Sequence, residues 1–274
     1  MNVVVDMGGT TTRVAVSEDG KQLQAKDRFP TPQSFDEGIS QIVETSKTLS
    51  GNSPITSVVV GIPGTINRTT GQVIRVAHIP SWDGRFPMQA FQKAFTVPVT
   101  LANDAELGAI GEATFGSGRG YRIVGYLAVG TGIGGALVLD RQLVPNAFHT
   151  EPGHMLMSPD KTGQGETLAV KAWEEVAAGP WFEERFGMKP QECKDPEIWS
   201  LFAQNVGVGM INVLLLWSPE VLIIGGGLSL NGEIFLAPLR TFVKDNLRMF
   251  PAPPIVAAAL GDDAGLYGGL TLLE

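Results

Sequence analysis

The chain has 274 residues, of which 43% are hydrophobic and 18% charged, so it can bury a sizeable core in one large or two modest domains. Its net charge is −8, and it has no run of Lys and Arg, which argues against a nucleic-acid or anionic-membrane surface. Cys193 is the only cysteine, which excludes an intrachain disulfide and a multi-cysteine zinc cluster.

The compartment is predicted from what the sequence lacks. The first residues read as a strand and carry no basic-then-apolar signal, and no apolar run approaches the roughly 20 residues of a membrane helix. We therefore expect a cytoplasmic protein with small-molecule partners, no nucleic acid and no membrane. The sequence leaves open whether the chain forms a homodimer.

A glycine turn lies near the start of the chain, between two apolar runs typical of strands. It reads Asp-Met-Gly-Gly-Thr-Thr-Thr-Arg over residues 6–13. Gly8 and Gly9 can take the positive φ angles of a tight turn, and they carry no side chain that would keep a ligand from the backbone N–H groups. The turn can therefore cradle a phosphate, although a plain hairpin explains this motif equally well on its own.

The residues beside this turn suit a nucleotide and its metal. Asp6 would place one carboxylate beside a hydrated Mg²⁺, and Arg13 adds a fixed cation. The hydroxyl donors of the turn are Thr10, Thr11 and Thr12.

The same pattern recurs in the second half of the chain. The apolar run 123–129 leads into Gly130-Thr131-Gly132-Ile-Gly-Gly and a second apolar run, 136–139. In both halves a further turn and a third run follow, at 21–29 and at 143–148, so each half is predicted to open with three strands joined by tight turns. Two matching turns suggest that one phosphate chain is held from both sides of a cleft.

Two other phosphate-binding motifs do not fit. Gly130, Gly132 and Gly135 spell G-x-G-x-x-G, but a dinucleotide site needs a helix to begin at this loop, and residues 134–140 read as a short strand. No G-x-x-x-x-G-K-[ST] occurs either, which excludes the P-loop.

A strand–helix–strand unit follows the first three strands. Apolar residues at helical spacing over 35–49 and a buried strand at 57–62 predict a parallel pair with a right-handed crossover. The loop Pro63-Gly64-Thr65 comes at the carboxyl end of that strand, where open α/β sheets bind ligands. Gly64 and Thr65 are therefore candidate substrate contacts, although a Pro-Gly turn explains them as well.

The segment Asn103-Asp104-Ala105-Glu106 has two compatible interpretations. Asn103 with Glu106 three positions later is a capping box, and Asp104 in the first turn suits the helix dipole. Asp104 also follows a predicted strand, so it can face the cleft as the base that accepts a hydroxyl proton during phosphoryl transfer.

Further candidates come from the second half. The segment His149-Thr150-Glu151-Pro152-Gly153-His154 favours polar substrate contacts over a metal, because H-E-x-x-H is absent. A helix is predicted at 168–178, carrying Glu174, and another at 201–217, buried on more than one side. The strand 220–227 ends in Gly225, Gly226 and Gly227, a loop that can admit a nucleotide base or simply allow close packing, and Asn231 can cap the next helix.

In combination and order these motifs resemble the ROK family of sugar kinases, within the sugar kinase/actin/Hsp70 superfamily. The resemblance covers 6–13, 61–65, 79–84, 101–112, 129–135, 151–154, 224–227 and 261–269. It implies an α/β fold of two lobes, actin-like (ribonuclease H-like), with a mixed sheet in each lobe and a cleft between. The expected lobes are 1–117, completed by a C-terminal helix at 263–274, and 118–262.

The resemblance also implies an activity: glucokinase-like transfer of the γ-phosphoryl of MgATP to a hydroxyl of a hexose or related sugar. It assigns the phosphates to the turns 6–12 and 130–132, the adenosine to 225–227, and the role of base to Asp104. The implied sugar contacts are Asn103, Glu151, His154 and Glu174.

The sequence departs from the family pattern at a cysteine-rich zinc motif, since 155–171 contains no cysteine. We therefore expect no structural zinc. His78 replaces a usual Asn, which leaves the sugar open, and no winged-helix segment precedes Asp6, so we expect no repressor function. The alternatives are a non-catalytic sugar or nucleotide sensor, a kinase for an N-acetylhexosamine or a non-sugar acceptor, and a kinase that uses polyphosphate.

Overall fold

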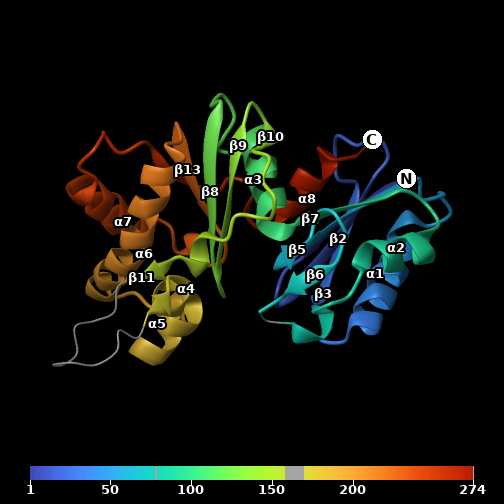
Figure 1. Ribbon diagram of the computed structural model, residues 1–274, viewed down its shortest axis with the longest axis horizontal. Coiled ribbons are helices and arrows are strands. Elements are labelled where there is room, and N and C mark those ends of the chain that lie inside the picture. The colour runs from blue at the N-terminus through green and yellow to red at the C-terminus, as the bar shows by residue number, and fades with distance from the viewer. Residues whose placement is uncertain (78, 158–169, 274) are drawn as a thin grey trace.

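Two five-stranded mixed sheets form the frame of the molecule, one in each lobe (Figure 1). The computed structural model describes residues 1–77, 79–157 and 170–273. The first sheet has the order β3-β2-β1-β4-β7, with strands β1 (Asn2–Met7), β2 (Thr11–Ser17), β3 (Ala25–Pro30), β4 (Ser57–Ile62) and β7 (Val99–Asn103). The second has the order β10-β9-β8-β13-β14, with strands β8 (Ile123–Val129), β9 (Ile133–Leu139), β10 (Gln142–Leu143), β13 (Val221–Gly225) and β14 (Ile255–Ala257).

The two sheets repeat one topology, as the paired glycine turns predict. In each, three antiparallel strands precede two strands that add in parallel to the first of the three. The turns close in similar ways: Gly8 N donates to Thr11 O at 3.0 Å, and Gly130 N donates to Gly132 O at 2.9 Å. The third strand of the second sheet ends at Leu143 rather than 148, since Pro145 has no N–H to continue the ladder.

Helices cover the sheets, and short ribbons and turns connect them. The helices are α1 (Phe35–Ser50), α2 (Pro87–Phe95), α3 (Asp104–Thr114), α4 (Glu174–Ala177), α5 (Gly179–Phe186), α6 (Pro196–Trp217), α7 (Glu233–Asn246) and α8 (Ala264–Leu270). The two-stranded ribbons are β5 (Thr65–Ile66) with β6 (Val73–Arg75), and β11 (Leu156–Met157) with β12 (Lys171–Ala172). The 3₁₀ turns are η1 (Pro80–Trp82), η2 (Pro152–His154), η3 (Pro190–Glu192), η4 (Ser229–Asn231) and η5 (Gly261–Asp263).

Each lobe has its own hydrophobic core. In the first lobe α1 and α2 pack on the sheet, and Trp82 meets the Phe35 ring edge-on with the centroids 4.8 Å apart. In the second, rings from α5, α6 and α7 cluster, with Phe182 and Trp199 buried at its centre. Residues 180–199, which have no clear period, therefore supply part of this core.

Helices α3 and α8 exchange between the lobes (Figure 1). Helix α3 follows β7 of the first sheet but packs on β8 and β9 of the second, whereas α8 follows β14 and packs on β1 and β4 of the first. The two helices cross at glycines: a Cβ on Gly111 would lie only 2.9 Å from Gly268 N. This crossing holds the two sheets so that both glycine turns face one cleft.

Two further sequence predictions about elements are wrong. The described part of the helix predicted at 168–178 begins as strand β12, and its helix starts only at Glu174, because residues 171–172 pair with β11. Asn231 does not cap α7, because its side chain donates to Leu228 O at 3.0 Å and Gly232 occupies the cap position. Among the described helices α6 is long and apolar enough to cross a membrane, by length and composition only, and it packs in the second core.

Candidate active site

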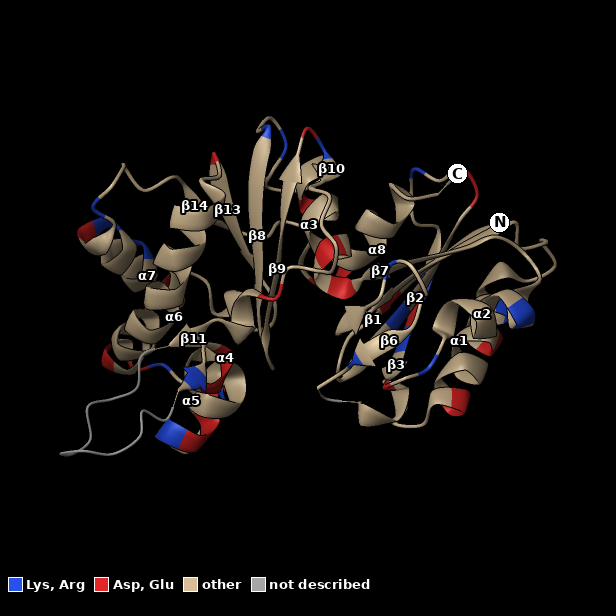
Figure 2. Ribbon diagram, in the orientation of Figure 1, with Lys and Arg blue, Asp and Glu red and all other residues tan. Residues whose placement is uncertain are grey.

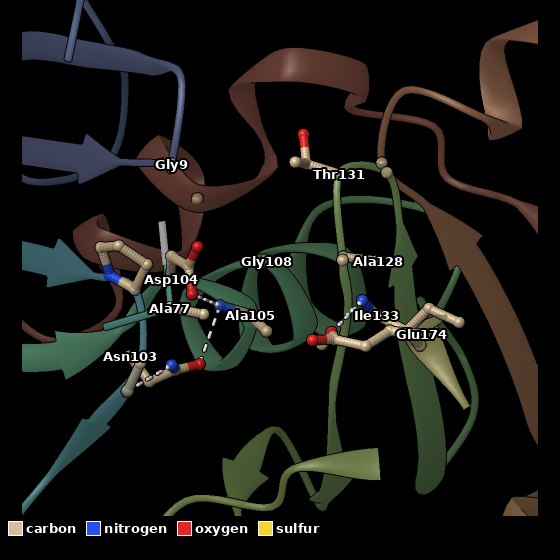
Figure 3. A pocket seen from close by; sticks show the side chains of 18 of the residues that line it. Gly9, Ala77, Asn103, Asp104, Ala105, Gly108, Ala128, Thr131, Ile133 and Glu174 are labelled. Atoms are coloured by element: carbon tan, nitrogen blue, oxygen red, sulfur yellow. Dashed lines mark hydrogen bonds between the residues drawn. The ribbon is translucent and has the colours of Figure 1, made fainter. Parts of the chain in front are cut away.

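A cleft of about 920 Å³ lies between the lobes (Figure 3). Both glycine turns line it, together with the loop after β4, the start of α3, the segment 150–154 and the end of β13. The predicted site residues found along its wall are Asp6, Gly8, Gly9, Gly64, Thr65, Asn103, Asp104, Gly130, Thr131, Gly132, Glu151, His154, Glu174, Gly226 and Gly227.

Four predicted nucleotide contacts do not line this cleft: Thr10, Thr11, Thr12 and Gly225. Thr12 is fully buried, and its hydroxyl pairs with the Thr31 hydroxyl at 3.0 Å. Thr31 in turn donates to Gly8 O at 2.8 Å, so Thr12 stiffens the turn from behind. A Cβ on Gly225 would lie 2.8 Å from the Tyr126 ring, so this glycine serves close packing.

Asp104 stands where β7 passes directly into α3. Asn103 caps the helix, as predicted, by accepting from Ala105 N at 2.9 Å and from Glu106 N at 3.2 Å. Its amide also donates to Gly64 O at 3.1 Å, which ties the loop after β4 to the helix start. Asp104 Oδ1 accepts from Ala105 N at 2.9 Å (Figure 3). The carboxylate is thus mounted on a rigid helix terminus with one oxygen held.

The surroundings of Asp104 suit a proton acceptor. The pKa of this carboxyl is raised to about 7, chiefly by burial and then by the negative charges of Asp6 and Glu151, against the opposing hydrogen bond from Ala105. A general base is most effective when its pKa lies near the working pH. The geometry and the pKa both fit removal of a proton from a hydroxyl placed beside Asp104.

Asp6 lies near the end of β1 and lines the same cleft as Asp104. Its pKa is raised to about 6, chiefly by burial and with a contribution from Asp262 and Asp263, while Arg13, with Nη1 3.8 Å from Asp6 Oδ2, opposes the rise. Arg13 Nη2 also lies 3.1 Å from Asp262 Oδ2. Helix α8 approaches so closely that a Cβ on Gly265 would lie 2.5 Å from Asp6 Cγ.

This corner of the cleft fits a hydrated Mg²⁺. Within residues 1–77, 79–157 and 170–273 no group of three or more His, Cys, Asp or Glu side chains is placed to hold a metal ion. Mg²⁺ keeps several waters in its shell and needs only one or two carboxylates beside the substrate phosphates. Asp6 can supply such a carboxylate, and the two glycine turns can hold the phosphates beside it. The predicted absence of a structural zinc concerns a segment that lies mostly outside the described residues, so it stays a prediction.

Acidic side chains form the opposite wall of the cleft. Thr65 Oγ1 donates to Glu151 Oε1 at 3.2 Å, which joins the two lobes. Glu174 Oε2 accepts from Ile133 N at 3.1 Å (Figure 3), and its other oxygen lies 3.9 Å from His154 Nε2. Burial raises the pKa of Glu151, whereas His154 and the Thr65 hydrogen bond lower it. These carboxylates and the imidazole can hold several hydroxyls of one polar ligand.

The sequence interpretation missed several cleft residues. Tyr126 sits in an apolar strand that reads as plain core, yet its ring lies against Gly108 and Gly225 at the cleft floor. Asp262 reads only as part of a helix start, and its contact with Arg13 shows a further charge beside Asp6 in the cleft. The signal in the sequence was the pair Asp262 and Asp263 directly before a helix of small residues.

The fold and the cleft define an α/β protein of the actin-like ATPase class, with a glycine turn from each lobe facing one cleft. The chain belongs to the ROK family, whose model matches residues 2–274. Together with its full-length kinase relatives, this makes it an ATP-binding sugar kinase of that family.

Its relatives match nearly full length. It is 30% identical to a glucokinase of Thermotoga maritima over 98% of this chain and 96% of that protein. A solved ROK family glucokinase from Streptomyces griseus, in complex with glucose and AMPPNP, superposes with a TM-score of 0.84 at 24% identity, covering 99% of this chain and 98% of that one. A ROK hexokinase from Thermus thermophilus gives 0.78 at 28% identity, with 98% and 96% covered. The predicted family and fold class are confirmed.

Proposed function

We propose that this kinase transfers the γ-phosphoryl of MgATP to a hydroxyl of a hexose or related sugar, by default the 6-hydroxyl, with Asp104 as the general base. The observation that carries the proposal is the position of Asp104. It lines the same cleft as both glycine turns and Glu151, His154 and Glu174, and its pKa is raised to about 7.

The nucleotide corner would hold the donor. The two glycine turns line the cleft from opposite lobes, and turns of this kind suit a triphosphate chain. Asp6 would hold Mg²⁺ through water, and that ion supplies neutralisation of phosphate charge when bound. Gly226 and Gly227 would lie beside the adenosine, where no side chain of theirs blocks the base.

The opposite wall would hold the acceptor. Asn103, Glu151, His154 and Glu174 would bind sugar hydroxyls, with Gly64 and Thr65 closing the site from the first lobe. Asp104 would then accept the proton of the attacking hydroxyl while the γ-phosphoryl moves from ATP. Phosphoryl transfer needs mainly positioning and charge neutralisation, so closure of the two lobes, which excludes water as a competing acceptor, would supply most of the rate.

The names of the relatives support a hexose as acceptor, and the glucokinase solved with glucose and AMPPNP supports ATP as donor. The decisive measurement is ADP release over glucose, mannose, fructose, allose and the N-acetylhexosamines, with polyphosphate in place of ATP in a parallel series. Turnover with ATP and a hexose supports the proposal. Turnover only with an N-acetylhexosamine or with polyphosphate would replace it, and ligand binding without turnover would indicate a sensor.

The role of Asp104 has a direct test in Asp104→Asn. This variant keeps the shape and the hydrogen bond to Ala105 N but lacks the base. We expect sugar affinity to stay within about tenfold, or ~1.4 kcal/mol, while turnover is nearly abolished. Asp36→Asn, on the exposed first turn of α1, is the matched control and should change neither quantity. Equal loss of affinity and turnover in Asp104→Asn would reduce Asp104 to a structural helix residue.

A further inference from the structure

A charged cluster lies outside the cleft, with Glu106 and His149 buried and the Arg68 side chain 39% exposed. Arg68 forms an ion pair with Glu106, and His149 Nδ1 lies 3.0 Å from the second carboxylate oxygen of Glu106. Arg68 Nη2 also lies 3.2 Å from His149 Nδ1 and donates to Asn146 Oδ1 at 3.1 Å. The side chains of Glu106 and His149 are each only 2% exposed. None of these four residues lines the cleft.

The cluster replaces a simpler local structure. The spacing of Asn103 and Glu106 predicts a capping box, in which Glu106 would bond back to the cap backbone. Asn103 does cap, but the Glu106 side chain turns to Arg68 and His149 instead. Burial raises the pKa of Glu106, and the hydrogen bond and charge of His149, with those of Arg68, outweigh it and leave the pKa below its ordinary value. Glu106 is therefore an ionised, paired carboxylate inside the protein.

His149 completes the cluster from the second lobe. Its Nδ1 lies 3.0 Å from Glu106 Oε2, and both this oxygen and His149 Nε2 are buried with no hydrogen-bond partner among the described residues. Glu106 therefore contacts Arg68 of the first lobe through one oxygen and His149 of the second through the other.

The three segments that meet here are those that carry the sugar-facing residues. Arg68 lies in the turn of the β5–β6 ribbon, three positions after Thr65. Glu106 lies two positions after Asp104, and His149 two positions before Glu151. On the cleft side the same ribbon and segment are joined once more by the bond from Thr65 to Glu151. Figure 2 shows acidic residues on α3, the helix that lies between the lobes.

We propose that Arg68, Glu106 and His149 are positioning residues that clamp the two lobes around the acceptor. The clamp fixes Thr65, Asp104 and Glu151 relative to one another, so that the sugar hydroxyl meets the base at the correct distance. This inference rests on the proposed function for its kinetic consequence only, because the clamp itself is a property of the free protein. The Glu106 carboxylate is buried although Arg68 is 39% exposed, so moving Arg68 away would leave a buried charge without this partner.

The kinetic test uses Arg68→Met, His149→Asn and the double variant. Each single change should lower kcat and raise the sugar KM, giving about a tenfold or larger loss in kcat/KM for the sugar, since a misplacement of about 1 Å can cost 10²-fold. The ATP KM should change less than about twofold. The double variant should lose little more than the worse single one, because both changes open one clamp. Arg68→Lys should recover part of the loss, since it keeps the charge but not the fork of donors.

The structural test needs no substrate. Hydrogen exchange in the free protein should speed up in Arg68→Met at the β5–β6 ribbon and at 146–151 together, while α7 stays as protected as before. Arg122→Met is the matched control, because it breaks an exposed bidentate pair with Asp140 inside the second lobe and should leave exchange and kinetics at wild-type values.

The two tests separate the two ideas. If the wild-type protein phosphorylates no sugar, the proposed function fails, and hydrogen exchange still decides the clamp. Unchanged exchange at the ribbon and at 146–151 in Arg68→Met would overturn the clamp. Equal rises of the sugar and ATP KM values, or fully additive losses in the double variant, would overturn its role in positioning the acceptor.

Discussion

At the scale of single residues, the cleft floor sets two carboxylates against each other. Burial raises the pKa of Asp6 to about 6 and that of Asp104 to about 7, and the negative charge of Asp6 adds to the rise at Asp104. A folded structure that raises a carboxyl pKa favours the protonated form and is destabilised when the group ionises. The ionised forms of Asp6 and Asp104 therefore lower the stability of the folded protein.

This conflict predicts that Asp104→Asn stabilises the protein at high pH. The folded pKa, about 7, lies above the ordinary value of 3.8. The wild type thus loses stability as pH rises above 3.8 and through 7, whereas the neutral Asn does not. One pKa unit corresponds to ~1.4 kcal/mol, so we expect a gain of about 2 kcal/mol near pH 8, after allowing for solvent screening of a partly exposed group.

Chemical denaturation of both proteins across pH measures this gain. The difference should disappear near pH 4, where the carboxyl of the folded wild type is protonated. A constant difference at every pH would mean that the substitution acts through packing rather than through charge. The variant is also the one expected to lose turnover, so the result would show that the base is maintained at the expense of stability.

The sequence correctly predicted that Asn103 caps the helix and that Asp104 lies in its first turn, because a helix cap is a local pattern. It could not predict the direction of the Glu106 side chain, since the partners that turn it away from the cap come from two distant segments. Thr12 illustrates the same limit. In the sequence, a hydroxyl beside a glycine turn is a candidate hydrogen-bond donor to a phosphate. Only the pairing with the Thr31 hydroxyl shows that the Thr12 side chain faces inward.

At the scale of elements, the crossing of α3 and α8 decides how the lobes sit. A Cβ on Gly268 would lie 2.6 Å from the carbonyl carbon of Leu107, which is backbone of α3. Neither helix can move away from the other without losing its packing, which for α3 is on β8 and β9 and for α8 is on β1 and β4. We therefore expect Gly268→Ala to lower the free energy of unfolding by about 2 kcal/mol or more, because overpacking against backbone cannot be relieved by a rotamer change.

Gly269→Ala is the matched control on the same helix. Its Cβ would meet the Val4 side chain at 3.0 Å, and a side chain can shift where backbone cannot. Both changes improve helix propensity equally. Urea denaturation should therefore rank Gly268→Ala well below Gly269→Ala. Similar values for the two variants would show that the crossing is not a rigid contact.

Most elements could be predicted from periodicity, but the sheet on which each helix packs could not. The repeated strand–glycine turn–strand pattern predicted two matching sheets because turns and alternation are local. Helix α3 was predicted at the right residues, yet the sequence does not say that it leaves its own sheet, since nearly every face of it is buried and no polar side marks the outside. The lobe division at 117 and 118 stays a prediction, and the exchange of α3 bears on where it is drawn.

At the scale of the whole molecule, the two lobes join at the α3–α8 crossing and border one cleft. The largest core cluster of each lobe is its own, and beside the cleft the lobes are linked by the Arg68 cluster and by the bond from Thr65 to Glu151. A change in the separation of the lobes would therefore pivot about the crossing. A ligand that touches both lobes then shifts the population toward the closed arrangement.

Sugar and nucleotide should therefore bind cooperatively, even though they occupy different ends of the cleft. Whichever binds first bears the free energy of closing the lobes, and the second binds to a cleft already closed. Calorimetric titration of the sugar, with and without a non-hydrolysable ATP analogue, should show affinity raised by about 5-fold or more, which corresponds to a coupling of at least ~1 kcal/mol. Linkage requires the same factor for the analogue titrated with and without sugar. Arg68→Met should raise this factor, because losing a contact between the lobes leaves more of the closing free energy to the first ligand, and Arg122→Met should leave the factor unchanged. Independent binding in the wild type would mean that the cleft is already closed, and catalysis would then have to exclude water by the fixed shape of the site.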